Sequence, residues 1–225
     1  MSLALAENFQ QVRHEIALAE QLAQRPAGSV ALLAVSKTKP AKLIAEAYRL
    51  GQRHFGENYL QEAVSKQRQL SAFNITWHFI GPIQSNKTKL IASHFAWVHS
   101  VDRLKIAQRL SEQRPEHLPP LNICLQVNIS GEASKSGIQL ADLAQLVQEV
   151  NQLPGLRLRG VMAIPEPETD IQRQRLPYRQ LFQTVQALKR PELDSFSYGM
   201  SGDLTAAICE GATIVRIGTA LFGER

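Results

Sequence analysis

Cysteine is scarce in this sequence, and its scarcity excludes several kinds of protein. The 225 residues include only two cysteines, Cys124 and Cys209, which lie far apart and each inside an apolar stretch. Neither has a neighbour at metal-ligand or redox-motif spacing, so a disulfide framework, a metal centre and a thiol-based redox site are not expected. We predict two reduced, buried thiols.

Long apolar runs are also missing. No run approaches the ~20 residues that a membrane-spanning helix requires. From Glu7 onward polar and charged residues interrupt the apolar ones, so we expect no secretory leader. These absences predict a soluble, cytoplasmic protein that does not bind a membrane.

Charge of one sign is not concentrated anywhere in the chain. There are 25 lysines and arginines against 20 acidic residues, a net charge of +5, and the basic residues are scattered, often beside acids. Nucleic-acid binding needs a concentrated basic patch, so we do not expect it. A modest positive charge does suit a site that attracts a dianionic phosphate.

The sequence does contain a regular alternation of helix-like and strand-like segments. A first helix is predicted because apolar residues recur at spacings of four and three, at Leu5, Phe9, Val12, Ile16 and Ala19. Eight strand-like segments follow, at residues 30–36, 54–58, 76–81, 96–101, 121–130, 156–164, 195–200 and 213–218. Helix-like segments separate them, at residues 40–50, 59–70, 85–93, 102–113, 140–152, 172–189 and 202–210.

This alternation predicts a closed (β/α)8 barrel with an extra N-terminal helix, in one domain covering residues 1–225. An open doubly wound sheet is the alternative, but eight units of even length favour closure. Within the helices, Asp102 is expected to act as an N-cap. Pro177 is expected to kink its helix or delay its start.

Two segments near the C-terminus have the composition of a phosphate site. Ser201 and Gly202 follow the seventh strand, and Gly218 and Thr219 follow the eighth. In a barrel these two loops are neighbours and commonly bind phosphate. Ser201 and Gly202 are also expected to open a helix, whose free N–H groups favour an anion. The alternative is that Ser201 is only an N-cap and Gly218 only a turn glycine.

Lys37 and Arg216 complete the pattern that pyridoxal 5′-phosphate requires. Lys37 ends the first strand, which closes against the eighth, and a lysine desolvated there beside a cation can form a Schiff base with the cofactor's aldehyde. A solvated strand-end lysine, such as Lys39, is the alternative. Arg216 lies inside an apolar strand and needs an acceptor: either the cofactor's ring nitrogen or an internal acid such as Glu57.

The chain also resembles a known family. In order, it contains the motifs AVSKTKP, FGENY, WHFIGPIQSNK, SKSGI, RGVMAI, GMSGD and VRIGTALFG, which span about Leu32 to Gly223. These motifs resemble those of the pyridoxal phosphate homeostasis protein family, whose fold-type III barrel is similar to the N-terminal domain of alanine racemase. One departure is Gly202, where an acid is frequent in the family.

The resemblance implies a role for each of eight residues toward pyridoxal 5′-phosphate. Lys37 would form the Schiff base, Arg216 would lie near the ring nitrogen, and Ser201, Gly218 and Thr219 would surround the phosphate. The remaining implied pocket residues follow the second, fifth and sixth strands: Asn58, Asn128 and Met162.

The implied function is to hold pyridoxal phosphate and deliver it within the cell, without substrate turnover and with no catalytic residue. The alternative is an amino-acid racemase or decarboxylase. A racemase needs a second base, a tyrosine from a β-domain that follows the barrel, and we expect no such domain here. The expected partners are the cofactor and apo-enzymes that need it, with Lys135 or Lys39 as a relay, and the protein is expected to be a monomer.

Overall fold

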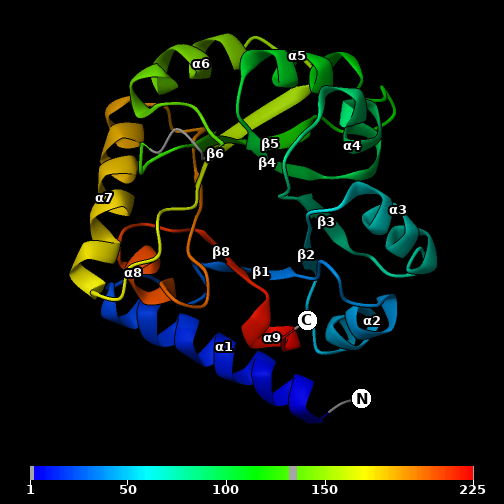
Figure 1. The fold of residues 1–225 in the computed structure, drawn as a ribbon, viewed down its shortest axis with the longest axis vertical. Helices are drawn as coiled ribbons and strands as arrows, with labels where there is room; N and C mark the ends of the chain where they lie inside the picture. The colour runs from blue at the N-terminus through cyan, green and yellow to red at the C-terminus, as the bar shows by residue number, and fades with distance from the viewer. Residues whose placement is uncertain (1–2, 132–135, 225) are drawn as a thin grey trace.

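A computed structural model describes residues 3–131 and 136–224, and in it eight parallel strands form a closed barrel (Figure 1). Each strand pairs with the next along the chain, and β8 closes against β1, with Leu33 opposite Arg216. The predicted (β/α)8 barrel is therefore confirmed, and the alternative of an open sheet is wrong.

The strands are shorter than the sequence predicts. They are β1 (Ala31–Val35), β2 (His54–Glu57), β3 (Thr76–Phe79), β4 (Trp97–Val101), β5 (Leu121–Val127), β6 (Leu156–Ala163), β7 (Ser195–Ser197) and β8 (Ile214–Ile217). Most of the missing residues lie at the C-terminal ends, where polar side chains and glycines leave the sheet.

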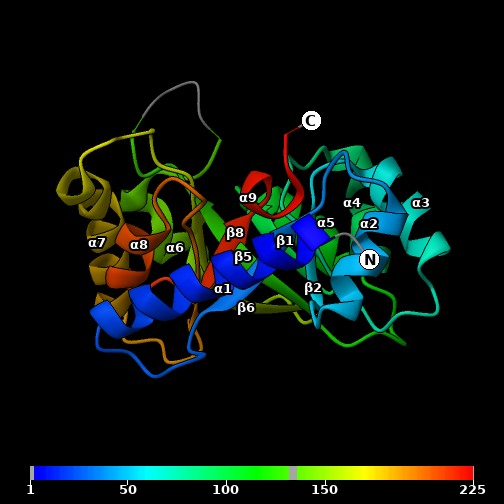
Figure 2. The ribbon, with the colours of Figure 1, turned by 90° about the horizontal axis from the view of Figure 1, so that it is seen from below.

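The helices surround the barrel on the outside (Figures 1 and 2). They are α1 (Leu3–Leu22), α2 (Ala41–Arg49), α3 (Leu60–Gln69), α4 (Thr88–His94), α5 (Leu104–Glu112), α6 (Leu143–Val150), α7 (Ile171–Ala187), α8 (Leu204–Cys209) and α9 (Thr219–Phe222). The 3₁₀ turns Ser85–Lys87 and Leu140–Asp142 precede α4 and α6. None of these helices is both long and apolar enough to cross a membrane.

Helix α1 is the predicted extra helix, and it packs against α8 and α9. The five residues of its predicted apolar stripe are all buried. Glu20, next to that stripe, is buried as well, because its carboxylate accepts the N–H groups of Gly28 and Val30 at 3.0 and 2.8 Å. This contact ties α1 to the segment that enters β1.

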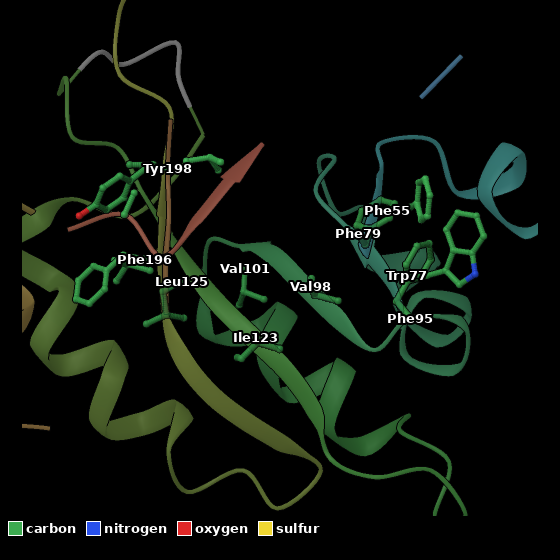
Figure 3. Packing of buried hydrophobic residues seen from close by; sticks show 14 of the residues in the cluster. Phe55, Trp77, Phe79, Phe95, Val98, Val101, Ile123, Leu125, Phe196 and Tyr198 are labelled. Carbon is green, nitrogen blue, oxygen red and sulfur yellow. The ribbon is translucent and has the colours of Figure 1, made fainter. Parts of the chain in front are cut away.

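The outward-facing side chains of the strands and the inward faces of the helices form the hydrophobic core. Figure 3 shows one aromatic group, in which the rings of Phe79 and Phe95 meet edge to face at 5.2 Å. On the other side of the barrel, Tyr198 stacks on Tyr178 of α7 at 4.7 Å. These contacts fix the helices to the barrel and thereby fix the loops that leave its C-terminal end.

Two predictions about helix starts are wrong. Helix α5 begins at Leu104 with Arg103 in the N-cap position, because the Asp102 carboxylate is engaged by the Arg103 guanidinium at 2.8 Å. Helix α8 begins at Leu204 rather than Gly202. The expected dipole of a helix opening at Ser201 is therefore absent from that position.

Pro177 lies inside α7 without delaying its start. The helix begins at Ile171, because Asp170 caps it by accepting the N–H of Arg173 at 2.9 Å. An N-cap bond of this kind stabilises a helix by about 1 kcal/mol. It lets the first turn form ahead of the proline, so the expected delay is wrong.

Candidate cofactor site

A cavity of about 340 Å³ lies at the C-terminal end of the barrel. Its walls come from the ends of six strands and the loops that follow them. The lining residues are Val35, Lys37, Asn58, Ile80, Ile164, Met200, Ser201, Gly202, Arg216, Gly218 and Thr219. The loops after β7 and β8, which were selected from composition, are therefore neighbours around one cavity.

Lys37 reaches this cavity from the turn after β1. It lies in the turn two residues beyond Val35, is half-buried, and donates no hydrogen bond to any described residue. Lys39 differs: its ammonium donates to the carbonyls of Gly223 and Glu224 at 3.0 and 2.7 Å. The structure thus leaves the Lys37 amine available to a ligand and uses Lys39 to hold the C-terminal segment.

The turn that carries Lys37 is held from below by a buried polar network. Lys66 of α3 donates to the Ser36 carbonyl at 2.7 Å and to Glu57 at 2.8 Å, and it also pairs with Glu62. The Ser36 hydroxyl donates to Glu57 at 2.6 Å. Burial raises the pKa of Glu57, although the nearby Lys66 opposes that change. The network joins β1, β2 and α3 and was not found from the sequence.

Arg216 is 5 % exposed and lines the floor of the cavity. Its guanidinium donates to the carbonyl of Ser197, to the Ser197 hydroxyl at 3.1 Å and to the carbonyl of Ala163 at 3.0 Å. Burial lowers its pKa. The alternative partner Glu57 is wrong, because the guanidinium bonds to Ser197 and Ala163, whereas Lys66 and Ser36 bind Glu57 through its Oε1.

Asn58 supplies an unsatisfied polar atom to the cavity wall. Its side-chain oxygen, Oδ1, is buried and accepts no hydrogen bond from a described residue. Its backbone is fixed by Gly81, where an added Cβ would lie 2.2 Å from the Asn58 carbonyl oxygen. Buried polar atoms are almost always hydrogen-bonded, so an orphaned oxygen at a cavity indicates a missing ligand group.

The loop after β7 supplies unpaired backbone donors. The N–H groups of Ser201 and Gly202 donate to no acceptor among the described residues. The adjacent Asp203 turns its carboxylate into the loop, where it accepts the Met200 N–H at 2.6 Å and the Tyr178 hydroxyl at 2.5 Å. Free N–H groups beside Gly218 and Thr219 form a cradle suited to an anion.

Two expected residues lie outside this cavity lining. Met162 is 1 % exposed within β6, level with Ser197 of β7. Asn128 follows β5 and donates its backbone N–H to Ile138 at 2.9 Å. Their roles toward a cofactor remain predictions. Lys135, expected as a relay, lies outside the described residues.

Three histidines on consecutive strands were not expected from the sequence. His54, His78 and His99 lie in β2, β3 and β4 and are hydrogen-bonded in series inside the barrel. A signal was available, because each of these three strands has one histidine next to an aromatic or apolar residue. A barrel interior is normally filled by branched apolar side chains, so three inward-facing histidines indicate an unusually polar, hydrogen-bonded interior.

The fold and cavity define a class of protein: a (β/α)8 barrel with a lysine, an arginine and an anion cradle at its C-terminal mouth. A family model described as the alanine racemase N-terminal domain matches residues 8–225. The pyridoxal phosphate homeostasis protein of Pseudomonas aeruginosa is 61% identical over 221 residues, which cover 98% of this chain and 96% of that protein. The chain belongs to the alanine racemase N-terminal domain family and, within it, to the pyridoxal phosphate homeostasis proteins.

Solved structures agree with this assignment. PipY of Synechococcus elongatus, solved with pyridoxal phosphate bound, has a TM-score of 0.82 and 38% identity, and the match covers 97% of this chain and 100% of that one. Alanine racemase from Corynebacterium glutamicum has a TM-score of 0.70 at 15% identity, over 99% of this chain and 61% of that one. The second match supports the fold alone.

Proposed function

We propose that this protein binds pyridoxal 5′-phosphate reversibly and serves the intracellular homeostasis and delivery of the cofactor, without turning over a substrate. The observation that carries the proposal is the convergence of the Lys37 amine, the Arg216 guanidinium and the unpaired N–H groups of Ser201 and Gly202 on one cavity. PipY, solved with this cofactor, and the P. aeruginosa homeostasis protein support it.

Each part of the cofactor has a matching group in the cavity. Lys37 would supply the amine for covalent attachment to the aldehyde. The Ser201–Gly202 and Gly218–Thr219 segments would hold the phosphate, and Arg216 would face the ring nitrogen. The orphaned Asn58 Oδ1 would accept a hydrogen bond from a polar substituent of the ring. When bound, the cofactor supplies an electron sink for bonds at an attached amine.

The same cavity supports holding the cofactor rather than catalysis. Among its described lining residues, Lys37 and Arg216 are the only ionisable side chains, and an arginine, which keeps its proton, cannot serve as a base. A racemase needs one base on each face of the cofactor. An arginine beside the ring nitrogen would also leave that nitrogen unprotonated, which would weaken the electron sink. A racemase or decarboxylase is therefore the less supported function.

The proposal extends to the oligomeric state and the cellular location of the protein. We infer a single-domain monomer in the cytoplasm that passes the cofactor to apo-enzymes. The structure describes Cys124 and Cys209 as free thiols, and burial raises the pKa of Cys124 to about 12, so that thiol resists deprotonation. Such thiols suit a reducing compartment. Light scattering of the purified protein, at several concentrations, tests the monomer.

The test of attachment is borohydride reduction of the cofactor-loaded protein followed by peptide mass spectrometry. We expect the reduced cofactor on Lys37 and no label in Lys37→Ala. The unfolding free energy of Lys37→Ala should lie within about 0.5 kcal/mol of that of the parent, because a half-exposed lysine contributes little packing. Lys39→Ala is the matched control and should retain the label. Label on Lys39, or on no lysine, would contradict the assignment.

The test of function separates delivery from catalysis. The loaded protein is incubated with an apo-enzyme that needs the cofactor and, separately, with L-alanine in heavy water. We expect activation of the apo-enzyme and no appreciable deuterium at the α-carbon. Rapid deuteration or racemisation would establish the alternative, an enzyme.

A further inference from the structure

A chain of hydrogen-bonded side chains runs through the inside of the barrel, from the floor of the cofactor cavity toward the opposite end. Arg216 Nη1 donates to Ser197 Oγ at 3.1 Å, and Ser197 Oγ lies 2.7 Å from His99 Nδ1. His99 Nε2 lies 2.9 Å from His78 Nδ1, and His78 Nε2 lies 2.9 Å from His54 Nδ1. Five strands thus contribute one member each.

The direction of this chain is set at its arginine end. Arginine has no acceptor, so Ser197 Oγ accepts from Arg216 and must place its own hydrogen on another group. His99 Nδ1 is the acceptor within reach. If His99 donated instead, the buried serine hydroxyl would have no acceptor, which is costly. His99 Nδ1 is therefore bare, and its hydrogen lies on Nε2.

The hydrogen on His99 Nε2 also fixes the direction of the hydrogen bonds between the histidines. His99 Nε2–H donates to His78 Nδ1, and His78 Nε2–H then donates to His54 Nδ1. All three rings are neutral: burial lowers the pKa of each, and the positive Arg216 also lowers that of His99, to about 3. His54 Nε2 consequently bears a hydrogen, and no described residue accepts it.

His54 lies at a second cavity, of about 340 Å³, at the N-terminal end of the barrel. The apolar part of its wall comes from the starts of β1, β4 and β8: Ala31, Leu32, Leu33, Trp97 and Ile214. Thr213 adds a donor, because its hydroxyl oxygen accepts the Phe196 N–H at 2.8 Å and its own hydrogen is not used by a described residue.

The charges in this wall cancel each other. Arg159 and Asp194 form a two-pronged ion pair, with N–O distances of 3.0 and 2.7 Å, and the guanidinium lies over the Trp97 ring at 5.1 Å. The Ser195 hydroxyl also donates to Asp194, at 2.7 Å. The acceptors at the cavity are thus occupied, while the donors of His54 and Thr213 are open.

We propose that this far cavity binds a small monocarboxylate with an apolar body, whose oxygens accept hydrogen bonds from His54 Nε2–H and the Thr213 hydroxyl. The open donors suit a ligand with acceptor oxygens, the apolar wall suits a short hydrocarbon, and Asp194 disfavours a dianion. If the hydrogen bonds ran in the opposite direction, His54 Nε2 would carry no hydrogen, and the cavity would suit an ammonium instead. The serial histidine bonds oppose a metal, and no metal-binding group of three or more ligands occurs among the described residues.

The site goes beyond the proposed function and does not depend on it. Its donors lie on strand starts, at the opposite end of the barrel from Lys37. Lys37→Ala should therefore leave it intact, and a failure to find cofactor on Lys37 would not affect it. Conversely, His54→Leu should retain the cofactor label on Lys37.

The direction of the hydrogen-bond chain is tested first. The measurement is a long-range ¹H–¹⁵N correlation spectrum of the full-length protein labelled with ¹⁵N-histidine. We expect His54, His78 and His99 all to bear their hydrogen on Nε2. In Ser197→Ala, where the serine link is absent, His99 should no longer be held in one tautomer. A hydrogen on Nδ1 of all three rings in the parent protein would overturn the proposal.

The ligand is tested by titration with propionate, n-propylammonium and propionamide, probes of matched size. Propionate should shift the His54 resonances saturably and leave the exposed His14 and His117 unchanged, and n-propylammonium should have no effect. His54→Leu should weaken propionate binding roughly tenfold or more, the loss of a hydrogen bond to a charged group, and Thr213→Val about fivefold. The Thr213 variant serves if His54→Leu does not fold.

Three results would overturn the ligand assignment. Saturable binding of n-propylammonium without propionate would show that the cavity presents an acceptor. No saturable shift with any of the three probes would show that the cavity holds water only. Equal binding of propionamide and propionate would remove the requirement for a charge and contradict a carboxylate ligand.

Discussion

The two ends of the barrel treat their polar groups differently. At the C-terminal end, Lys37, the Asn58 oxygen and the N–H groups of Ser201 and Gly202 have no partner among the described residues. At the N-terminal end, Arg159 and Asp194 satisfy each other, and the histidines are bonded in series. The first end is open to a ligand with several polar groups, and the second leaves only a few donors for a small one.

The difference has a structural origin. The C-terminal groups lie on loops that follow the strands, where the backbone is freed from the sheet and can present N–H groups and side chains to a ligand. The N-terminal groups lie in the strands or directly before them, where sheet register fixes them and neighbours can pair. Arg216 and the histidine chain connect the two ends, so changes to them report on both.

The largest expected effect is a loss of stability at acidic pH. His78 and His99 are buried and neutral in the folded protein, with pKa values below the usual 6.5, while the unfolded chain would protonate them normally. The stability that comes from these neutral rings is therefore complete above pH 6.5 and is lost as the pH falls below 6.5, for His99 down to about pH 3. Each histidine should cost about 1.4 kcal/mol per pH unit in that window.

Urea denaturation between pH 7.5 and 4.5 measures this slope. His99→Asn should give a shallower fall in unfolding free energy with decreasing pH than the parent, whatever its stability at pH 7.5. Exposed His14 offers the control, since His14→Asn should leave the slope unchanged. Equal slopes for the parent and the His99 variant would show that His99 is not held neutral.

The next effect compares an arginine from each end. Arg216→Met should lower the unfolding free energy by about 2–5 kcal/mol, because it leaves the Ser197 and Ala163 carbonyls buried without a donor. Arg159→Met, at the far end, removes a partly exposed ion pair and should cost no more than about 1 kcal/mol. Urea denaturation at pH 7.5 measures both losses. A larger loss of unfolding free energy in Arg159→Met than in Arg216→Met would contradict the difference between the two ends of the barrel.

The smallest effect concerns backbone strain at the turn that carries Lys37. Thr38 has φ of +64°, a left-handed conformation that is unfavourable for a β-branched residue. Thr38→Gly should stabilise the protein by about 1 kcal/mol and also loosen the turn, so that the cofactor dissociates faster. Lys189 has φ of +52° away from the cofactor cavity, and Lys189→Gly should leave cofactor dissociation unchanged. Equal dissociation rates in both variants would show that the turn does not position Lys37.

Much of the fold could be predicted from the sequence because the relevant signals are local. The apolar stripe of α1, the eight strand-like segments and the composition of the loops after β7 and β8 need only neighbouring residues to be read. Closure of the barrel then follows from the number and even length of the units, and it brings Ser201 and Gly218 to one cavity.

Helix starts were predicted less well, because they depend on competition between nearby groups. Asp102 has the chemistry of an N-cap, but the guanidinium of Arg103 engages its carboxylate. The helix after β7 starts at Leu204, because Asp203 stabilises a turn by accepting the Met200 N–H. Propensity alone cannot decide which of two available hydrogen bonds forms.

The sequence by itself determined the barrel, the extra helix and which strand ends carry Lys37, Arg216 and the two glycine-containing loops that line one cavity, because period, spacing and residue type carry that information along the chain. Only the tertiary structure decided the partners of the buried polar groups: Lys66 for Glu57, backbone carbonyls for Arg216, and a one-directional chain from Ser197 through three histidines. The physical reason is that each such group, once removed from water, must bond whatever donor or acceptor the closed barrel brings within about 3 Å, and those atoms belong to strands distant in sequence.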